Sequence, residues 1–258
     1  MKPLVSQIVF RFALVISIST LVGCVSYGPA ITGGELPFVP ISSLDTVPTA
    51  SVGGYGILAW PITYDAQNTN RLVGLGGYRT RGVPISPQGS NGWSFVYGAM
   101  AYTGQYTLNA DSTDIEYRYT GGMLHGATRW HWLSGQNFDF VLEPSLSIFY
   151  EGGNYLHFRR QSILEGADYQ ANPLSATLNF SQIVRYRVND RWSATGVYTT
   201  GLPLDRLLSK YSFSGTLALT RDQFTVWVRP GVHINVVSLA GLTSRTVSMG
   251  GSYRFVKR

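Results

Sequence analysis

The amino-acid sequence predicts an all-β fold in which about ten antiparallel strands, with eight as the alternative count, form a barrel. The main observation is an alternation of apolar and polar residues that recurs from residue 51 onward, a period typical of strands. Only 13% of residues are charged, while 13% are aromatic and 29 are glycine, whereas ordinary soluble proteins carry about 25% charged residues. The mean hydropathy of +0.03 indicates that apolar residues are spread along the chain and not gathered into membrane-spanning helices.

The first 24 residues form a segment of their own. Lys2 and Arg11 give it a basic start, and an apolar stretch over residues 12–22 is followed by Gly23 and Cys24. This order is typical of a signal peptide. The apolar stretch is too short for an uncleaved membrane anchor, which needs about 20 apolar residues.

This segment resembles a bacterial lipoprotein signal peptide. Residues 21–24, Leu-Val-Gly-Cys, match the family's pattern, in which the cysteine carries the lipid. The resemblance implies that residues 1–23 are removed and that Cys24 bears a covalent lipid such as palmitate, with no other cofactor. Val25 stands where an aspartate would retain the protein in the inner membrane, so a lipid-anchored protein in the outer membrane of a diderm bacterium is expected.

Residues 24–50 contain Pro29, Pro37, Pro40 and Pro48 and show no apolar period, which predicts an extended periplasmic tether before a barrel over residues 51–258. Removal of residues 1–23 leaves 18 of the 20 basic residues against 14 acidic ones. This mild balance, without a basic run, argues against a nucleic-acid partner.

The strands can be placed one by one from the alternation. Residues 138–151 are the clearest case, with Phe140, Leu142 and Ile148 on one face and acidic or hydroxyl residues on the other. The first two segments are rich in glycine and alternate poorly, which leaves eight strands as the alternative. The expected strands cover residues 51–63, 70–81, 93–108, 114–133, 137–151, 173–188, 191–201, 210–220, 223–237 and 243–256.

Short and long connections alternate along the chain. Short polar turns are expected at residues 109–113, 134–137, 189–191 and 220–223, as hairpins require. Longer links are expected at residues 152–172 and 201–210. Within residues 114–133 the apolar positions change parity near Gly121 and Gly122, which predicts a β-bulge there.

The body of the chain resembles bacterial outer-membrane β-barrels. Its polar faces carry mainly Ser, Thr and Asn, most expected strands have 11–16 residues, and Tyr253 and Phe255 alternate near the end, although three residues follow where that family ends on the aromatic residue. The resemblance implies a transmembrane barrel with short turns in the periplasm and the links at 152–172 and 201–210 outside. A soluble lipocalin-like lipoprotein that binds an apolar ligand is the structural alternative.

If the polar faces point inward, the ionisable side chains meet in the lumen. The acidic residues of strand 137–151 would lie between basic residues of the two neighbouring strands and pair with them, because unpaired charges in a narrow interior are unfavourable. A barrel of this size is about wide enough to be filled by its own side chains, so a structural network that plugs the lumen is expected. The predicted network comprises Glu116, Arg118, His125, Arg129, His131, Asp139, Glu143, Arg185, Arg187, Arg229 and His233, with Glu151 and Arg254 on the same faces.

An embedded hydrolase or acyltransferase acting on lipid or peptide is the alternative in function. It would use His125 or His131 with Asp139 or Glu143, and Ser145 or Ser147 as nucleophile. The sequence contains no GxSxG or HExxH motif and no phosphate-binding glycine loop, and its four histidines do not form a ligand pattern for a metal. The chain is therefore predicted not to be an enzyme.

The predicted role is structural or interactive within the envelope, with narrow passive passage of solutes if the network leaves a gap. The expected partners are outer-membrane lipid, including lipopolysaccharide, and an envelope protein. The link at residues 152–172 mixes aromatic and basic side chains, and such a loop outside the cell could contact lipopolysaccharide phosphates.

Overall fold

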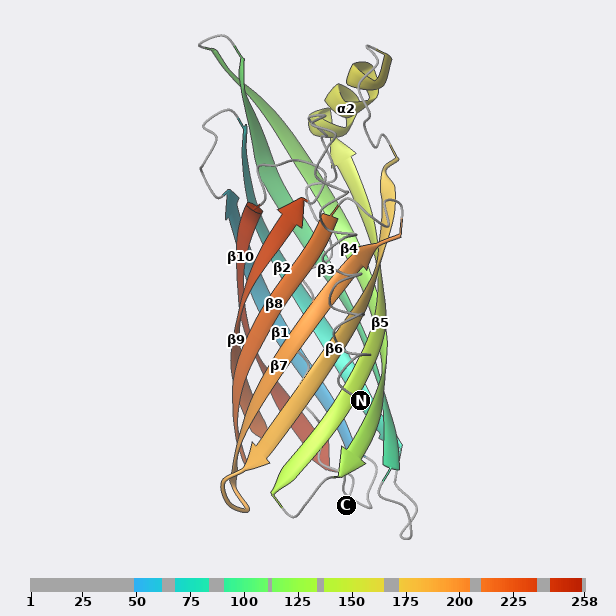
Figure 1. Cartoon of the computed structure of the whole chain (residues 1–258), viewed down its shortest axis with the longest axis vertical. Helices are drawn as coiled ribbons and strands as arrows, with labels where there is room; N and C mark the ends of the chain where they lie inside the picture. Colours follow the sequence, from blue (N-terminus) through green and yellow to red (C-terminus); the bar gives the residue numbers. More distant parts are fainter. Residues whose placement is uncertain are drawn as a thin grey trace, which may run out of the picture.

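The computed structural model describes residues 49–61, 68–83, 91–110, 113–133, 137–164, 172–204, 210–235 and 242–256. These residues form ten strands and one helix (Figure 1). The elements are β1 (Thr49–Pro61), β2 (Asn68–Val83), β3 (Asn91–Ala110), β4 (Thr113–Leu133), β5 (Phe138–Gly153), α2 (Asn154–Leu164), β6 (Leu174–Arg187), β7 (Trp192–Pro203), β8 (Lys210–Arg221), β9 (Phe224–Asn235) and β10 (Leu242–Val256). Cys24, with the rest of residues 1–48, lies outside the described residues.

The ten strands form one closed sheet. Each strand pairs antiparallel with its neighbours in the chain, and β1 pairs with β10 to close the barrel. The expected all-β fold and the count of ten are confirmed, including the two glycine-rich strands at the start. Ten strands about 4.8 Å apart and tilted by about 40° give a backbone diameter of about 20 Å.

The two ends of the barrel differ in construction. Figure 1 shows α2 at one end, here called the α2 end, and the tight hairpins at residues 188–191 and 222–223 at the other, the turn end. In the second hairpin Asp222 has a φ of 52°, a left-handed conformation that aspartate tolerates better than most residues. No helix in the described part of the chain has the length and apolar character needed to cross a membrane.

The link after β5 differs from the expectation of a plain loop, because its first part is α2. Gly153, which joins β5 to α2, has a φ of 113°, and a Cβ there would lie 2.6 Å from the carbonyl oxygen of Arg118. Only glycine fits this conformation and this close approach.

The predicted β-bulge in β4 is wrong. Gly121 pairs with Tyr102 and Gly122 with Ala101, and the register between β3 and β4 continues without a shift. What changes at this point is the chemistry of the inward face, from Tyr119 and Met123 to polar side chains such as His125. The sequence parity changes because the interior changes from apolar to polar, while the backbone stays regular.

Alternate residues of the strands point to opposite sides of the wall. The outward side is apolar and open, with exposed fractions of 73% for Leu75, 71% for Leu217 and 64% for Leu124. The inward side is buried, and Thr80, for example, is 0% exposed. The apolar outward side is the opposite of a soluble barrel, whose outer face is polar.

Candidate functional site

Five inward aromatic rings on β1–β4 and β9 each lie against a glycine. In every case the ring and the glycine are direct cross-strand partners, so the register sets the contact. A Cβ built on each glycine would collide with the ring of its partner. The pairs are Tyr55 with Gly76, Tyr78 with Gly53, Tyr102 with Gly121, Tyr119 with Gly104, and Trp227 with Gly250.

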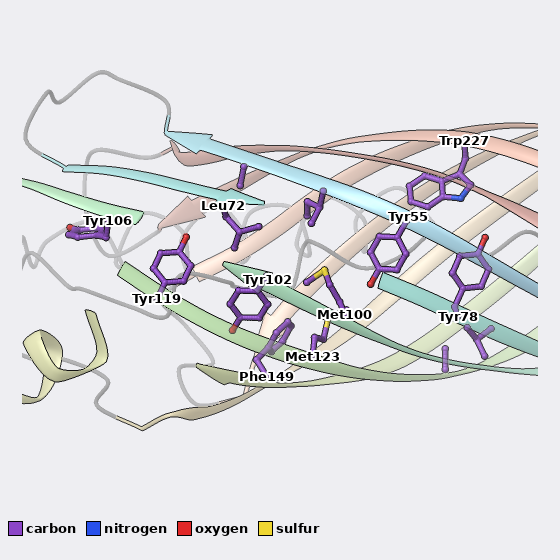
Figure 2. Packing of buried hydrophobic residues seen from close by; sticks show 14 of the residues in the cluster. Tyr55, Leu72, Tyr78, Met100, Tyr102, Tyr106, Tyr119, Met123, Phe149 and Trp227 are labelled. Carbon is purple, nitrogen blue, oxygen red and sulfur yellow. The ribbon is translucent and has the colours of Figure 1, made fainter. Parts of the chain in front are cut away.

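Two of these tyrosines are held along the wall by hydrogen bonds that span two strands. Tyr119 of β4 passes over β3 and donates its hydroxyl to the carbonyl oxygen of Arg71 on β2, at 3.0 Å. Tyr102 of β3 passes over β4 and donates to the carbonyl oxygen of Tyr150 on β5, also at 3.0 Å. Figure 2 shows these rings as part of a series that runs from Tyr106, near α2, to Tyr78 and Trp227.

The rest of the interior has a different chemistry. Its inward side chains on β5–β10 are mostly small hydroxyl groups, here called the hydroxyl wall, and neighbouring members bond to one another, as Ser181 and Thr199 do at 2.9 Å. The buried members are Ser145, Ser147, Thr177, Ser181, Thr195, Thr199, Ser212, Ser214, Thr216, Thr225, Thr246 and Ser248. The interior therefore combines a half lined by rings with a half lined by hydroxyls.

The carboxylates of β5 pair with arginines on both neighbouring strands. Glu143 forms an ion pair with Arg129 of β4. Asp139 pairs with Arg185 of β6 and also with Arg187, the latter at 2.7 Å. Except for Arg187, whose side chain is partly exposed, these groups are buried. The structure thus places the acidic residues of β5 between basic residues of β4 and β6.

Other members of the predicted network are placed differently. Glu116 and Arg118 are exposed on the outward face of β4, so their expected position in the lumen is corrected. The error follows from the parity change assumed at Gly121 and Gly122, which does not occur. Arg229 faces inward and donates to the hydroxyl of Ser214 at 2.8 Å from Nε, and the side chain of His233 lies outside the described residues.

The two inward histidines of β4 contact serines and not carboxylates. Nδ1 of His125 lies 3.0 Å from the Ser147 hydroxyl, and Nε2 of His131 lies 2.8 Å from that of Ser94. A histidine general base is normally oriented by a third group, most often a carboxylate. Here Asp139 and Glu143 are engaged by arginines, so the geometry does not assemble the catalytic set of the enzyme alternative. Within the described ranges no three His, Cys, Asp or Glu side chains come together as metal ligands would.

The sequence did not predict how α2 packs against its end of the barrel. Arg159 is buried and pairs with Glu151 at the end of β5. Tyr155 stacks on Tyr106 with ring centroids 4.6 Å apart, and Phe158 stacks on Tyr117 at 4.3 Å. Tyr155 and Arg159 are spaced i and i+4, which places both side chains on one face of a helix; this spacing is the sequence signal for their inward position.

Loss of the buried pair should loosen α2. We expect Arg159→Met to speed trypsin cleavage after the neighbouring exposed Arg160 at least about ten-fold, because cleavage requires local opening and a broken buried pair strongly favours the open state. Limited proteolysis followed by mass spectrometry measures the rate. His157→Ala, at an exposed position of the same helix, should cleave at the wild-type rate; equal rates for all three proteins would contradict the role of the pair.

The outward surface is bounded by charge at both ends. On β2, Arg71 and Arg79 both point outward and are exposed, and the outward residues between them are Val73, Leu75 and Gly77. Eight residues at about 3.3 Å each, tilted by about 40°, span about 20 Å along the barrel axis. Aromatic rings gather at the turn end, where Trp93 stacks on Trp130 with centroids 6.2 Å apart. An apolar band with charged and aromatic borders therefore surrounds the barrel.

Comparison with known proteins gives likeness in structure only. No family model and no curated protein matches the sequence. By structure, the chain is similar to outer-membrane β-barrels. The translocator domain of the autotransporter NalP from Neisseria meningitidis is 8% identical, with 82% of this chain and 89% of that chain covered and a TM-score of 0.45. The β domain of the Bordetella autotransporter BrkA is 9% identical, with 80% and 99% covered and a TM-score of 0.42. The outer membrane protein OprG from Pseudomonas aeruginosa is 8% identical, with 82% of this chain and 97% of that chain covered and a TM-score of 0.36. With so little identity, none of these proteins supplies a function for this chain.

Proposed function

We propose that this chain is an integral outer-membrane β-barrel with a structural or interaction role in the envelope. The observation that carries the proposal is the apolar band between Arg71 and Arg79. Its height of about 20 Å approaches the band of about 25 Å with which such barrels meet the hydrocarbon of a bilayer. In a soluble protein, exposed apolar residues on every second position around a closed sheet would cause aggregation.

The interior favours a structural role and argues against a wide channel. The inward side chains of both halves are buried, whereas the lining of a water-filled channel is in contact with solvent. Two buried carboxylates of β5 are neutralised by arginines from the neighbouring strands, Glu143 by Arg129 and Asp139 by Arg185. Such pairs link β4, β5 and β6 and give the wall a defined shape.

Narrow passive passage is the second candidate, and the hydroxyl wall favours it. Serine and threonine side chains are short, and the rings of Tyr102 and Tyr119 lie along the wall. Among the described inward residues away from α2, arginines outnumber carboxylates. They are Arg129, Arg185, Arg187, Arg229 and Arg254, against Asp139 and Glu143. A passage through this interior would favour anions.

Two measurements test these functions on the full chain. A membrane barrel should remain in the membrane fraction of Cys24→Ala cells and should migrate faster on a gel before boiling than after it, because strands and not the lipid hold it there. Release of the variant as a soluble protein would overturn the proposal. Planar-bilayer recording should then show no conductance steps for a structural barrel; steps with an anion-selective reversal potential would establish the second candidate instead.

The lipid anchor on Cys24 is part of the proposal. It predicts that labelled palmitate is incorporated into the wild-type chain and not into Cys24→Ala. The barrel should still assemble in the variant, since the lipid adds anchoring to a chain that the strands already hold in the membrane. Equal labelling of both proteins would contradict the proposed lipid anchor and would leave the proposed barrel unaffected.

A further inference from the structure

Three arginines lie in one row on the outward face at the α2 end. The register places Arg71 of β2 opposite Gln105 of β3, and Gln105 opposite Arg118 of β4. On the other side of β2, Arg245 of β10 pairs with Trp60 of β1, and the pairing of Ala59 with Leu72 puts Trp60 next to Arg71. The row therefore crosses five neighbouring strands in the order Arg245, Trp60, Arg71, Gln105 and Arg118.

The spacing and exposure of this row suit a ligand with more than one negative group. Each arginine is separated from the next by one strand, which gives a separation of about 10 Å. All three are exposed, and none of them forms an ion pair with a carboxylate of the described residues. Glu116, on the same face of β4 as Arg118, lies farther from the apolar band. Arginine binds phosphate oxygens through two parallel hydrogen bonds, which makes it the side chain best suited to phosphate.

The position of the row decides what kind of phosphate it meets. Directly below it, toward the turn end, the outward residues include Leu58, Val73 and Met249, so the row stands at the border of the apolar band. Lipid phosphates lie at this level of a bilayer, just beyond the hydrocarbon. Trp60 in the row is exposed and has the amphipathic ring that is enriched at this border.

We propose that Arg71, Arg118 and Arg245 form a site for the phosphate groups of lipid A in the leaflet that surrounds the α2 end. Lipid A carries two phosphates on one disaccharide, so a single molecule can engage two arginines of the row. The inference rests on the proposed membrane barrel and names its lipid partner. The same strand provides a contrast at the turn end, where Arg79 lies between Val52 and Tyr97 in its row and the one neighbouring arginine on the described outward face is Arg81 of the same strand.

The test uses the purified full chain in phosphatidylcholine nanodiscs with bisphosphorylated lipid A as the probe. The triple variant R71Q/R118Q/R245Q should bind lipid A about ten-fold more weakly than the wild type, because three exposed pairs with phosphate are each weak but act together. Arg79→Gln, the matched control, should bind like the wild type. Lipid A without phosphates should bind the wild-type protein as weakly as intact lipid A binds the triple variant.

Several results would overturn the site. They are equal binding by the triple variant and the wild type, an equal loss with Arg79→Gln, displacement of lipid A by the same charge of phosphatidylglycerol, or no preference for phosphorylated lipid A. The last two comparisons use only the wild-type protein, so they decide the matter even if the triple variant does not fold. Gel mobility before and after boiling is recorded for every protein, which separates failure of the site from failure of the membrane barrel.

Discussion

Glu143→Gln is expected to lower the free energy of unfolding by about 3–5 kcal/mol, the effect of removing one partner from a buried ion pair. Glu143 and Arg129 are both buried, on neighbouring strands of the barrel. The variant leaves the arginine charge in the interior without the carboxylate that balances it. Unfolding by urea in detergent micelles, followed by the fraction that retains fast gel mobility, measures the change.

The matched control is Glu116→Gln. It removes a carboxylate from β4 at an exposed, outward position, and surface charges contribute about 1 kcal/mol or less. Replacing both partners, Arg129→Met with Glu143→Leu, should restore much of the lost stability, because two well-packed apolar residues often replace a buried pair without loss. Similar stability of Glu143→Gln and Glu116→Gln would show that the pair does not brace the wall.

The alternation on β5 and β6 is enough to place the acidic residues of β5 on one inward face with the arginines of β6. On these strands the outward residues are apolar and the inward ones polar, so Asp139 and Glu143 could be placed on the face shared with Arg185. Contacts between consecutive strands of a regular antiparallel sheet can be predicted without knowing how distant parts of the chain are arranged.

On β1–β4 the alternation of apolar and polar residues is a weaker guide to which side chains point inward. Their inward face carries Tyr55, Tyr102 and Tyr119, so over part of these strands both faces are apolar and the alternation is weak there. The pattern within β4 predicts a parity change that does not occur, and this places Glu116 and Arg118 on the wrong side of the wall. The signal that resolves the ambiguity is the recurrence of tyrosine opposite glycine, and it becomes visible only when the register of two strands is known.

The arginine row and the packing of α2 could not be predicted from the sequence, because both depend on contacts between distant parts of the chain. Arg71 and Arg118 are 47 positions apart in the chain, and only the pairing of both with Gln105 shows that they share a row. The inward turn of Arg159 depends on its contact with Glu151, which α2 makes by folding back over the end of β5. Contacts of this kind are set by tertiary packing and not by local preference.

The pairing of rings with glycines gives the second large expected effect. Gly121→Ala should lower the free energy of unfolding by about 1–3 kcal/mol, the usual effect of overpacking. A Cβ at this position would collide with the ring of Tyr102 and with the carbonyl oxygen of Tyr150, the oxygen that accepts the hydrogen bond of the same ring. The methyl group therefore displaces the ring and breaks its bond to β5 in one step. The same urea titration measures the loss.

Gly126→Ala is the matched control on the same strand, because a Cβ there has no neighbour within 4 Å. This variant should be as stable as the wild type or slightly more stable, since alanine restricts the unfolded chain more than glycine does. Adding Tyr102→Leu to Gly121→Ala tests the cause, because the clash of the methyl group with the ring is then absent while its contact with the Tyr150 carbonyl oxygen stays the same. If the ring is responsible, the two substitutions together should lower stability by less than the sum of their separate effects, by at least about 0.5 kcal/mol. Strict additivity would mean that the ring does not rest on the glycine, and the aromatic half of the interior would then need a different explanation.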